Sequence, residues 1–210
     1  PGDPSVLNEK AVYVGSDEMT SGAFQGEFLA KFFKDQGKTD ISYLMLNGIL
    51  GQTSTTNRTA SVLKALEDNG IKATAAAAPL AADYDRATAM DMISPLLKTT
   101  KYDCIISNND AMALGAVEAM QQQGLDPKSV PIVGIDATAD GRQAIKDGTL
   151  AMTVFQNAEG QGRASLQAAA NLIDGKPIAE GTGYEVDDEN EFIIWVPFEP
   201  VTIDNVADYD

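Results

Sequence analysis

Short apolar runs alternate along the chain with longer segments in which apolar residues recur every three or four positions. The short runs are rich in Val, Ile and Leu, which is typical of buried strands. We expect strands near residues 11–14, 41–47, 71–77, 102–107, 131–135 and 151–155. This alternation of strands and helices predicts an α/β fold, in which a parallel sheet is flanked by helices.

The predicted helices are bounded by residues that favour helix ends. Glycine adopts the left-handed conformation that commonly ends a helix, and it follows three of these segments, at Gly37, Gly70 and Gly124. Within the clearest helix, residues 110–123, Gly115 indicates a close packing contact. Residues 84–98 also have a helical period, but Pro95 lacks the N–H that a continuing helix needs. We expect a kink or a restart there.

The pattern changes after about residue 158, where one long Ala-rich helix, a Gly/Pro loop and short strands at 192–196 and 201–203 follow. We expect this tail to belong to a different sheet, with chain crossings at Gly15 and near Gln156. The expected division is a lead-in strand next to the hinge at residues 1–15, a main α/β lobe at 16–156, and a helix and strands at 157–210 that belong to a second lobe and the hinge. If this tail is only part of a second lobe, apolar surface should be exposed on the long helix unless another chain covers it.

Charge and composition exclude several classes of function. The chain has 15 Lys and Arg against 31 Asp and Glu, a formal charge of −16, which repels polyanions and argues against nucleic acid or anionic lipid as a partner. Histidine is absent, which removes the commonest general base and metal ligand and weakens most enzyme interpretations. The single cysteine, Cys104, lies in an apolar run and is expected to be a buried hydrophobe. We expect no cofactor.

No segment has the length of a membrane span or the pattern of a signal peptide. The longest apolar runs fall short of the ~18 residues that a span needs, and the first four residues lack the basic and apolar regions of a signal sequence. We expect any targeting segment to have been removed or never included.

Several phrases are specific in combination: Tyr13-Val14-Gly15-Ser16-Asp17, Ser21-Gly22 with Gln25-Gly26, Ser107-Asn108-Asn109-Asp110-Ala111-Met112-Ala113-Leu114-Gly115-Ala116, Val133-Gly134-Ile135-Asp136-Ala137 and Trp195-Val196-Pro197. Together they resemble the galactose/glucose-binding and ribose-binding proteins of bacterial sugar uptake and chemotaxis, almost end to end. The resemblance implies a type I periplasmic-binding-protein fold with two α/β lobes, a three-strand hinge and a monosaccharide held between the lobes. This chain would be the C-terminal lobe with part of the N-terminal lobe, the rest of which is missing.

The same resemblance implies where such a protein works and with what. Its partners would be a monosaccharide and either the membrane permease of an ABC transporter or a chemoreceptor. Its location would be extracytoplasmic, in the periplasm or lipid-anchored at the cell surface. It would bind its ligand and catalyse nothing.

A neutral sugar needs polar groups that pair with its hydroxyls, because a buried hydroxyl without a partner costs about 1–3 kcal/mol, and it needs an aromatic face for its ring. In an open α/β sheet such groups lie beyond the carboxyl ends of the strands. The residues that meet these demands together with the family pattern are Arg58, Tyr84, Asn109, Asp136 and Gln156. Gln52 and Ser54 are further candidates.

Each of these residues also has a structural alternative. Asp136 follows a strand and would accept hydrogen bonds from adjacent hydroxyls, or it caps the next helix; Asn109, beside Asp110, has the same two alternatives. Arg58 lies in the first turns of a helix, where the helix dipole disfavours a positive side chain. This unfavourable position suggests that its guanidinium binds the ligand; the alternative is a solvated helix face.

The resemblance places Tyr84 against the sugar ring, with core packing as the alternative, and Gln156 at the second crossing, with hinge packing as the alternative. Two departures from the family concern specificity and metal. Galactose/glucose-type members carry His and Asp where this chain has Gln52 and Ser54, so the exact sugar stays open. The loop at residues 34–40 is short, carries two lysines and cannot supply the ~6–8 oxygen ligands that calcium prefers, so we expect no metal.

Other functions compete with transport. The ligand-sensing domain of a receptor, or of a sugar-responsive repressor, shares the architecture. A nucleotide-binding enzyme is disfavoured, because the turn Gly15-Ser16-Asp17-Glu18 has neither a Gly-x-Gly-x-x-Gly run nor a phosphate loop. A glycosidase built on Asp136 with Asp110 or Asp17 remains a further alternative.

Overall fold

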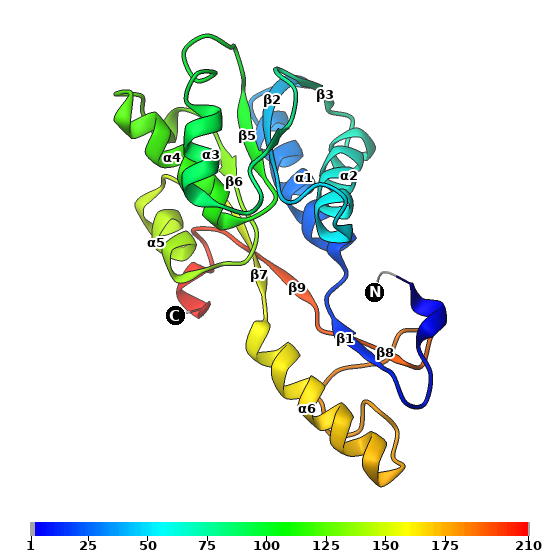
Figure 1. The fold of residues 1–210 in the computed structure, drawn as a ribbon. Coiled ribbons are helices and arrows are strands. Elements are labelled where there is room, and N and C mark those ends of the chain that lie inside the picture. The colour runs from blue at the N-terminus through cyan, green and yellow to red at the C-terminus, as the bar shows by residue number, and fades with distance from the viewer. Residues whose placement is uncertain (1–2, 210) are drawn as a thin grey trace. The chain divides into compact units, whose positions relative to one another are not determined.

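The computed structural model describes residues 3–209 (Figure 1). Pro1, Gly2 and Asp210, which the expected segments 1–15 and 157–210 include, lie outside the described residues. The chain forms two compact units. The smaller one comprises Pro1–Asp17 with Gln156–Phe198, and the larger one comprises Glu18–Phe155 with Glu199–Asp210.

A five-stranded parallel sheet forms the centre of the larger unit (Figure 1). Its order is β3-β2-β5-β6, and β4 also pairs with β2, every pair being parallel. The strands are β2 (Asp40–Asn47), β3 (Lys72–Ala75), β4 (Leu80–Ala81), β5 (Cys104–Ser107) and β6 (Ile132–Val133). Because parallel neighbours need crossover connections, helices separate most of them in sequence. The predicted α/β class, with a parallel sheet flanked by helices, is confirmed.

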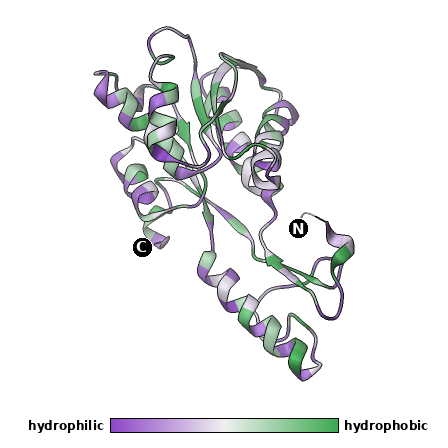
Figure 2. Cartoon of the chain, viewed as in Figure 1, coloured by the Kyte–Doolittle hydropathy of each residue, from purple (hydrophilic) through white to green (hydrophobic). Residues whose placement is uncertain are grey.

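Helices cover both faces of this sheet. On one side α1 (Glu18–Lys34) packs against α2 (Thr53–Asp68); on the other lie α3 (Arg86–Ile93), α4 (Asp110–Gln122) and α5 (Ala139–Asp147). Figure 2 shows apolar strands between helices that carry many polar residues. The core includes Leu44, Ile105, Met112 and Ile132. Removal of this apolar surface from water is the main stabilising contribution.

Helix ends in the larger unit follow the sequence signals. Gly37, Gly70 and Gly124 follow α1, α2 and α4 with φ of 70°, 71° and 71°. The helix α3 ends at Ile93, two residues before Pro95, so it covers only part of the predicted segment 84–98. The close contact predicted at Gly115 is confirmed, because a Cβ there would lie 2.3 Å from the backbone oxygen of Arg86.

The smaller unit contains α6 (Ala158–Asp174) and a parallel pair of strands, β1 (Tyr13–Gly15) and β8 (Ile193–Trp195). Its buried core includes Ala168, Ile178 and Ile194. Short 3-10 helices complete the chain at η1 (Pro4–Val6), η2 (Pro127–Ser129) and η3 (Val206–Tyr209). Among residues 3–209, none of the helices combines the length and apolar character that a bilayer crossing requires.

The C-terminal segment differs from the expectation. The expectation assigns residues 157–210 to the second lobe and the hinge, but Glu199–Asp210 belongs to the larger unit. Val201 and Val206 are 0% and 3% exposed in the core of that unit, and this burial explains why the segment returns to it. The last strand is β9 (Phe198–Val201), which pairs with β7 (Thr153–Gln156) and lies earlier than the predicted 201–203.

The number of chain crossings changes accordingly. The chain passes between the two units three times, at residues 17–18, 155–156 and 198–199. Only two crossings follow from the residue pattern, at Gly15 and near Gln156. The third cannot be seen in the pattern, because the chain returns for only twelve residues and has no helix of ordinary length there to mark the change.

Candidate functional site

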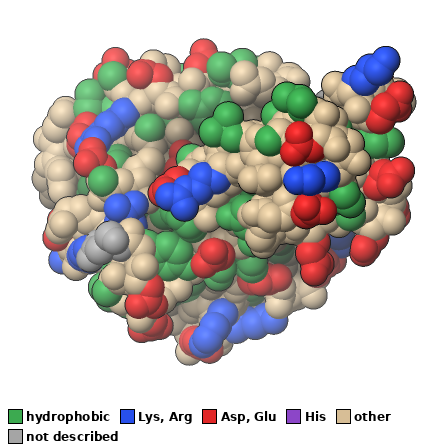
Figure 3. All heavy atoms as spheres, turned by 90° about the horizontal axis from the view of Figure 1, so that it is seen from below, with side chains coloured by type: hydrophobic (Ala, Val, Ile, Leu, Met, Phe, Trp, Pro, Cys, Tyr) green, Lys and Arg blue, Asp and Glu red, His purple; other side chains and the backbone are tan. Residues whose placement is uncertain are grey.

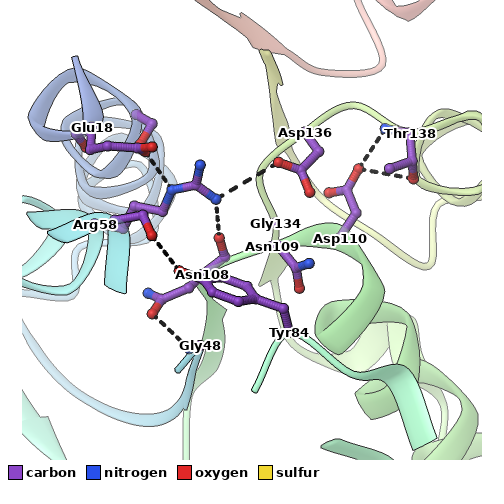
Figure 4. Close-up of polar contacts among 12 residues, drawn as sticks. Glu18, Gly48, Arg58, Tyr84, Asn108, Asn109, Asp110, Gly134, Asp136 and Thr138 are labelled. Carbon is purple, nitrogen blue, oxygen red and sulfur yellow. Dashed lines mark hydrogen bonds and ion pairs between the residues drawn. The ribbon is translucent and has the colours of Figure 1, made fainter. Parts of the chain in front are cut away.

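Polar side chains gather beyond the carboxyl ends of three neighbouring strands in the larger unit (Figure 4). Asn47 ends β2, Asn108 and Asn109 follow β5, and Asp136 lies three residues after β6. Parallel strands end at the same edge of a sheet, so these groups meet there. Thr59 of α2 joins them, since its hydroxyl donates to Asn47 Oδ1 at 3.1 Å.

Asp110 links the two most specific sequence motifs, residues 107–116 and 133–137. Its side chain is fully buried, and its carboxylate accepts hydrogen bonds from Thr153 Oγ1 at 2.6 Å and from the backbone N–H of Thr138 at 2.9 Å. A Cβ on Gly134 would lie 2.3 Å from Asp110 Oδ1, so a glycine is required for this approach. Burial raises the pKa of Asp110 to about 7, against the lowering effect of the Thr153 hydrogen bond. Asp110 therefore holds the strand ends together.

Asp136 has a different environment from Asp110. Its φ of 117° is unusual for a residue with a side chain, and its backbone N–H donates to the oxygen of Val154 at 2.7 Å. The side chain is 27% exposed, and no residue in the described part of the chain donates a hydrogen bond within normal distance to its carboxylate. Burial raises the pKa of Asp136 to about 6, and the Arg58 charge opposes this rise.

Capping explains one of the two strand-end residues but not the other. The N-cap of α5 is Thr138, whose side chain accepts from the backbone N–H of Gly141 at 3.0 Å, so the capping alternative for Asp136 is wrong. Asn109 does cap α4, because its Oδ1 accepts from the backbone N–H of Met112 at 3.0 Å. Its amide nitrogen donates to no described residue, which leaves a donor for another partner.

Arg58 is only 5% exposed, so the alternative of a solvated helix face is wrong. Its Nε donates to Glu18 Oε2 at 2.6 Å, and its Nη1 donates to the backbone oxygen of Asn108 at 2.8 Å. The same Nη1 lies 3.7 Å from Asp136 Oδ1, an ion pair longer than a hydrogen bond. Figure 4 shows the guanidinium between the two carboxylates.

Tyr84 is half-buried, and its ring lies flat against the backbone at Gly48, where a Cβ would come within 2.0 Å of the ring. The phenol oxygen lies 2.8 Å from the hydroxyl oxygens of both Ser54 and Thr55. Its φ of 64° places it in the left-handed region. These contacts fix the ring at the start of α2, near the carboxyl edge of the sheet (Figure 4).

The two glutamines among the predicted residues lie at other positions in the fold. Gln52 is exposed at the N-cap of α2, and its side chain makes no capping hydrogen bond. Gln156 ends β7 and belongs to the smaller unit. The larger unit thus brings together Arg58, Asn109 and Asp136 with Tyr84 and Ser54 nearby.

Sequence reasoning missed several residues of the cluster, among them Glu18 and Asn108. Asn108 is fully buried, and its Oδ1 accepts from the backbone N–H of Gly48 at 3.1 Å. Glu18 begins α1 one turn before Gly22 and two turns before Gly26. That spacing puts Glu18 on the glycine face of the helix, and this was the available signal.

The cluster carries one positive and two negative side chains, Arg58 against Glu18 and Asp136. Such a balance disfavours an anionic ligand. Figure 3 shows acidic side chains spread across one face of the molecule with Lys and Arg side chains between them. Within residues 3–209 no group of three or more His, Cys, Asp or Glu side chains is placed to hold a metal ion. Cys104 is buried, as predicted, and burial raises the pKa of its thiol.

Comparisons with known proteins agree on one family. A family model described as "periplasmic binding protein domain" matches residues 3–177. The chain is 36% identical to the D-galactose/methyl-galactoside binding periplasmic protein of Haemophilus influenzae, over 96% of this chain and 61% of that protein. It is 28% identical to the ribose import binding protein of Escherichia coli, over 81% of this chain and 55% of that protein.

Among solved structures, an ABC transporter solute binding protein from Bacillus halodurans with bound myo-inositol superimposes with a TM-score of 0.77 at 32% identity. That match covers 94% of this chain and 62% of the other. The chain therefore spans less than two thirds of the length of these relatives.

Proposed function

The chain belongs to the periplasmic binding protein domain family, and from this membership we propose that its larger unit supplies ligand contacts for an extracytoplasmic solute-binding protein. The proposed ligand is a neutral monosaccharide or a related cyclic polyol. Relatives carry galactose, methyl-galactoside and ribose in their names, and one similar structure holds myo-inositol. All of these are compact rings or chains with several adjacent hydroxyls.

The observation that carries this proposal is the state of the Asp136 carboxylate. It is mostly enclosed and accepts no normal hydrogen bond from the described residues, although its pKa of about 6 leaves it ionised at neutral pH. A mostly enclosed carboxylate without donors from the protein is unfavourable, because it keeps only part of the hydrogen bonding that water would supply. Two adjacent hydroxyls of a sugar would supply them. Charge-assisted hydrogen bonds of this kind are stronger than those between neutral groups.

The neighbouring residues fit the same ligand chemistry. Arg58 presents a planar group beside Asp136, and the amide nitrogen of Asn109 supplies a further donor. We assign to Tyr84 the flat face against the ring of the ligand. We retain Gln156 as a proposed ligand contact, and Ser54 as an indirect one through the phenol of Tyr84.

We propose that the protein binds without catalysis. A glycosidase needs two carboxylates that reach the same glycosidic bond. Asp110, a candidate partner for Asp136, is fully buried, and both its oxygens accept hydrogen bonds from threonine groups. It is therefore unable to donate a proton to a bound sugar.

We further propose that the bound ligand passes to the permease of an ABC transporter or to a chemoreceptor outside the cytoplasm. Several relatives are named as import or periplasmic binding proteins, which supports this location. Full affinity, in this proposal, requires the rest of the N-terminal lobe, of which the smaller unit is a part. The chain alone should bind at millimolar strength or weaker, equivalent to about −4 kcal/mol.

Isothermal titration calorimetry with ribose, xylose, glucose, galactose and myo-inositol tests the proposal, on this chain and on a longer form with the full length of its relatives. Asp136→Ala should weaken binding by about 1–3 kcal/mol. Asp91→Ala, at an exposed position on α3, is the matched control and should change nothing. Unaltered affinity in Asp136→Ala would remove the proposed role of Asp136. Release of a new reducing end from a glycoside would refute binding without catalysis.

A further inference from the structure

Two glycines allow α1 and α2 to approach closely. A Cβ on Gly22 would lie 2.3 Å from the backbone oxygen of Arg58, and one on Gly26 would lie 2.6 Å from that of Val62. Both separations are too short for any side chain. The two helices are therefore in backbone contact at this crossing, beside Arg58.

Glu18 lies on the same face of α1, one turn before Gly22. The close crossing brings its carboxylate to Arg58, whose Nε donates to Glu18 Oε2 at 2.6 Å. The side chains of Glu18 and Arg58 are 20% and 6% exposed. Enclosure weakens solvent screening, so this ion pair is stronger than one on the surface.

Arg58 has two carboxylates within reach but contacts them unequally. It is hydrogen-bonded to Glu18, whereas its Nη1 stays 3.7 Å from Asp136 Oδ1. The guanidinium is also held by the bond from Nη1 to the backbone oxygen of Asn108. Because Nε and Nη1 are both held by these hydrogen bonds, the guanidinium cannot turn to form a bidentate contact with Asp136.

We propose that Glu18 is a positioning residue of the ligand site, which holds Arg58 back from Asp136 so that the Asp136 carboxylate remains open to ligand hydroxyls. The inference rests on the proposed function. In the absence of the Glu18 carboxylate, Asp136 remains as an opposite charge beside Arg58. The two would close into a direct salt bridge, and a ligand would then have to break it before it could bind.

The charges around Asp136 allow a test without ligand. Arg58 faces it from α2, Glu18 acts on it from α1, and Asp110 lies behind it at the start of α4. In Glu18→Gln, a negative neighbour is lost and Arg58 moves closer. Both changes favour the ionised form of Asp136 and so lower its pKa.

The first measurement is an NMR titration of the Asp136 side-chain carboxyl carbon in this chain. Glu18→Gln should lower the proton affinity of Asp136 about tenfold or more. Glu27→Gln, an exposed position on the same helix, is the control and should leave it unchanged. A titration of Asp136 that is the same in Glu18→Gln as in the wild type would overturn the inference, whether or not a ligand has been found.

The second measurement is the affinity of the same variants, at pH 7.5, for whichever sugar or polyol binds the wild type. Glu18→Gln should bind about tenfold more weakly, and Glu18→Asp, which keeps the charge, should recover most of the loss. Equal losses in both variants would indicate a merely structural residue and would refute the positioning role. If the wild type binds none of the ligands, the proposed function fails, and the titration still decides the coupling between Glu18 and Asp136.

Discussion

Asp136→Asn should make the unliganded protein more stable at neutral and alkaline pH while it removes a ligand contact. Asparagine has nearly the size of aspartate and is one of the few residues that tolerate a positive φ, so the backbone at 117° is preserved. The change therefore isolates the charge. In the wild type this charge is mostly enclosed and lacks hydrogen-bond donors of normal length among the described residues.

The pKa of Asp136 gives the size of the effect. Burial raises it from 3.8 to about 6, so the folded protein binds more protons than the unfolded chain between these values. The contribution of Asp136 to stability is thus complete below pH 3.8 and falls as the pH rises through about 6. Each pKa unit corresponds to about 1.4 kcal/mol, which gives about 3 kcal/mol in all. Partial exposure reduces this, and we expect about 1–2 kcal/mol.

Urea unfolding at a series of pH values from 4 to 8 measures this difference. The free energy of unfolding of Asp136→Asn should match the wild type at pH 4 and exceed it by about 1–2 kcal/mol at pH 8. Asp91→Asn, at an exposed position, provides the matched control and should follow the wild type throughout. A constant difference between Asp136→Asn and the wild type over the whole range would show that the charge is not the cause.

Three further substitutions test the packing that supports the site. Gly134→Ala should lower the free energy of unfolding by about 2 kcal/mol, measured by urea titration, because the new methyl would displace the buried carboxylate of Asp110. Tyr84→Phe should cost about 1 kcal/mol in the same assay, since it loses the contacts with two hydroxyls but keeps its ring. Val206→Ala should lower the thermal midpoint by several degrees, since Val206 is buried in the core of the larger unit, whereas Leu166→Ala, at a 77% exposed position on α6, should leave it nearly unchanged.

Much of the larger unit could be predicted from the sequence because its signals are local. Strand and helix periods, and glycines such as Gly70 at a helix end, depend on a few neighbouring residues. The return of Glu199–Asp210 to this unit has no local signal. It depends on the burial of Val201 and Val206 among residues distant in sequence, which no pattern within the segment reveals.

The positions of site residues at strand ends could be predicted, because they follow from the topology of the sheet. The contacts between helices and loops that complete the site could not. Parallel strands end at one edge, so Asn109 and Asp136 could be placed together from the strand assignments alone. Whether each of them caps a helix could not be decided, because Thr138 offers an equally good cap two residues after Asp136. Glu18 was missed because its contact with Arg58 spans 40 positions and depends on how closely two helices cross.

The two aspartates at neighbouring strand ends have different roles: Asp110 stabilises the fold, and Asp136 is the proposed ligand contact. Asp110 and Asp136 are both enclosed, and burial raises the pKa of both. The oxygens of Asp110 are occupied by donors from Thr138 and Thr153, so its burial is offset within the fold. The carboxylate of Asp136 is partly desolvated but accepts no hydrogen bond of normal length from the described residues, and its backbone has a φ that few residues adopt. An unfavourable state of this kind persists because the surrounding structure enforces it, and a ligand that supplies the donors relieves it on binding. The same missing hydrogen bonds that weaken the free protein thus strengthen the proposed complex.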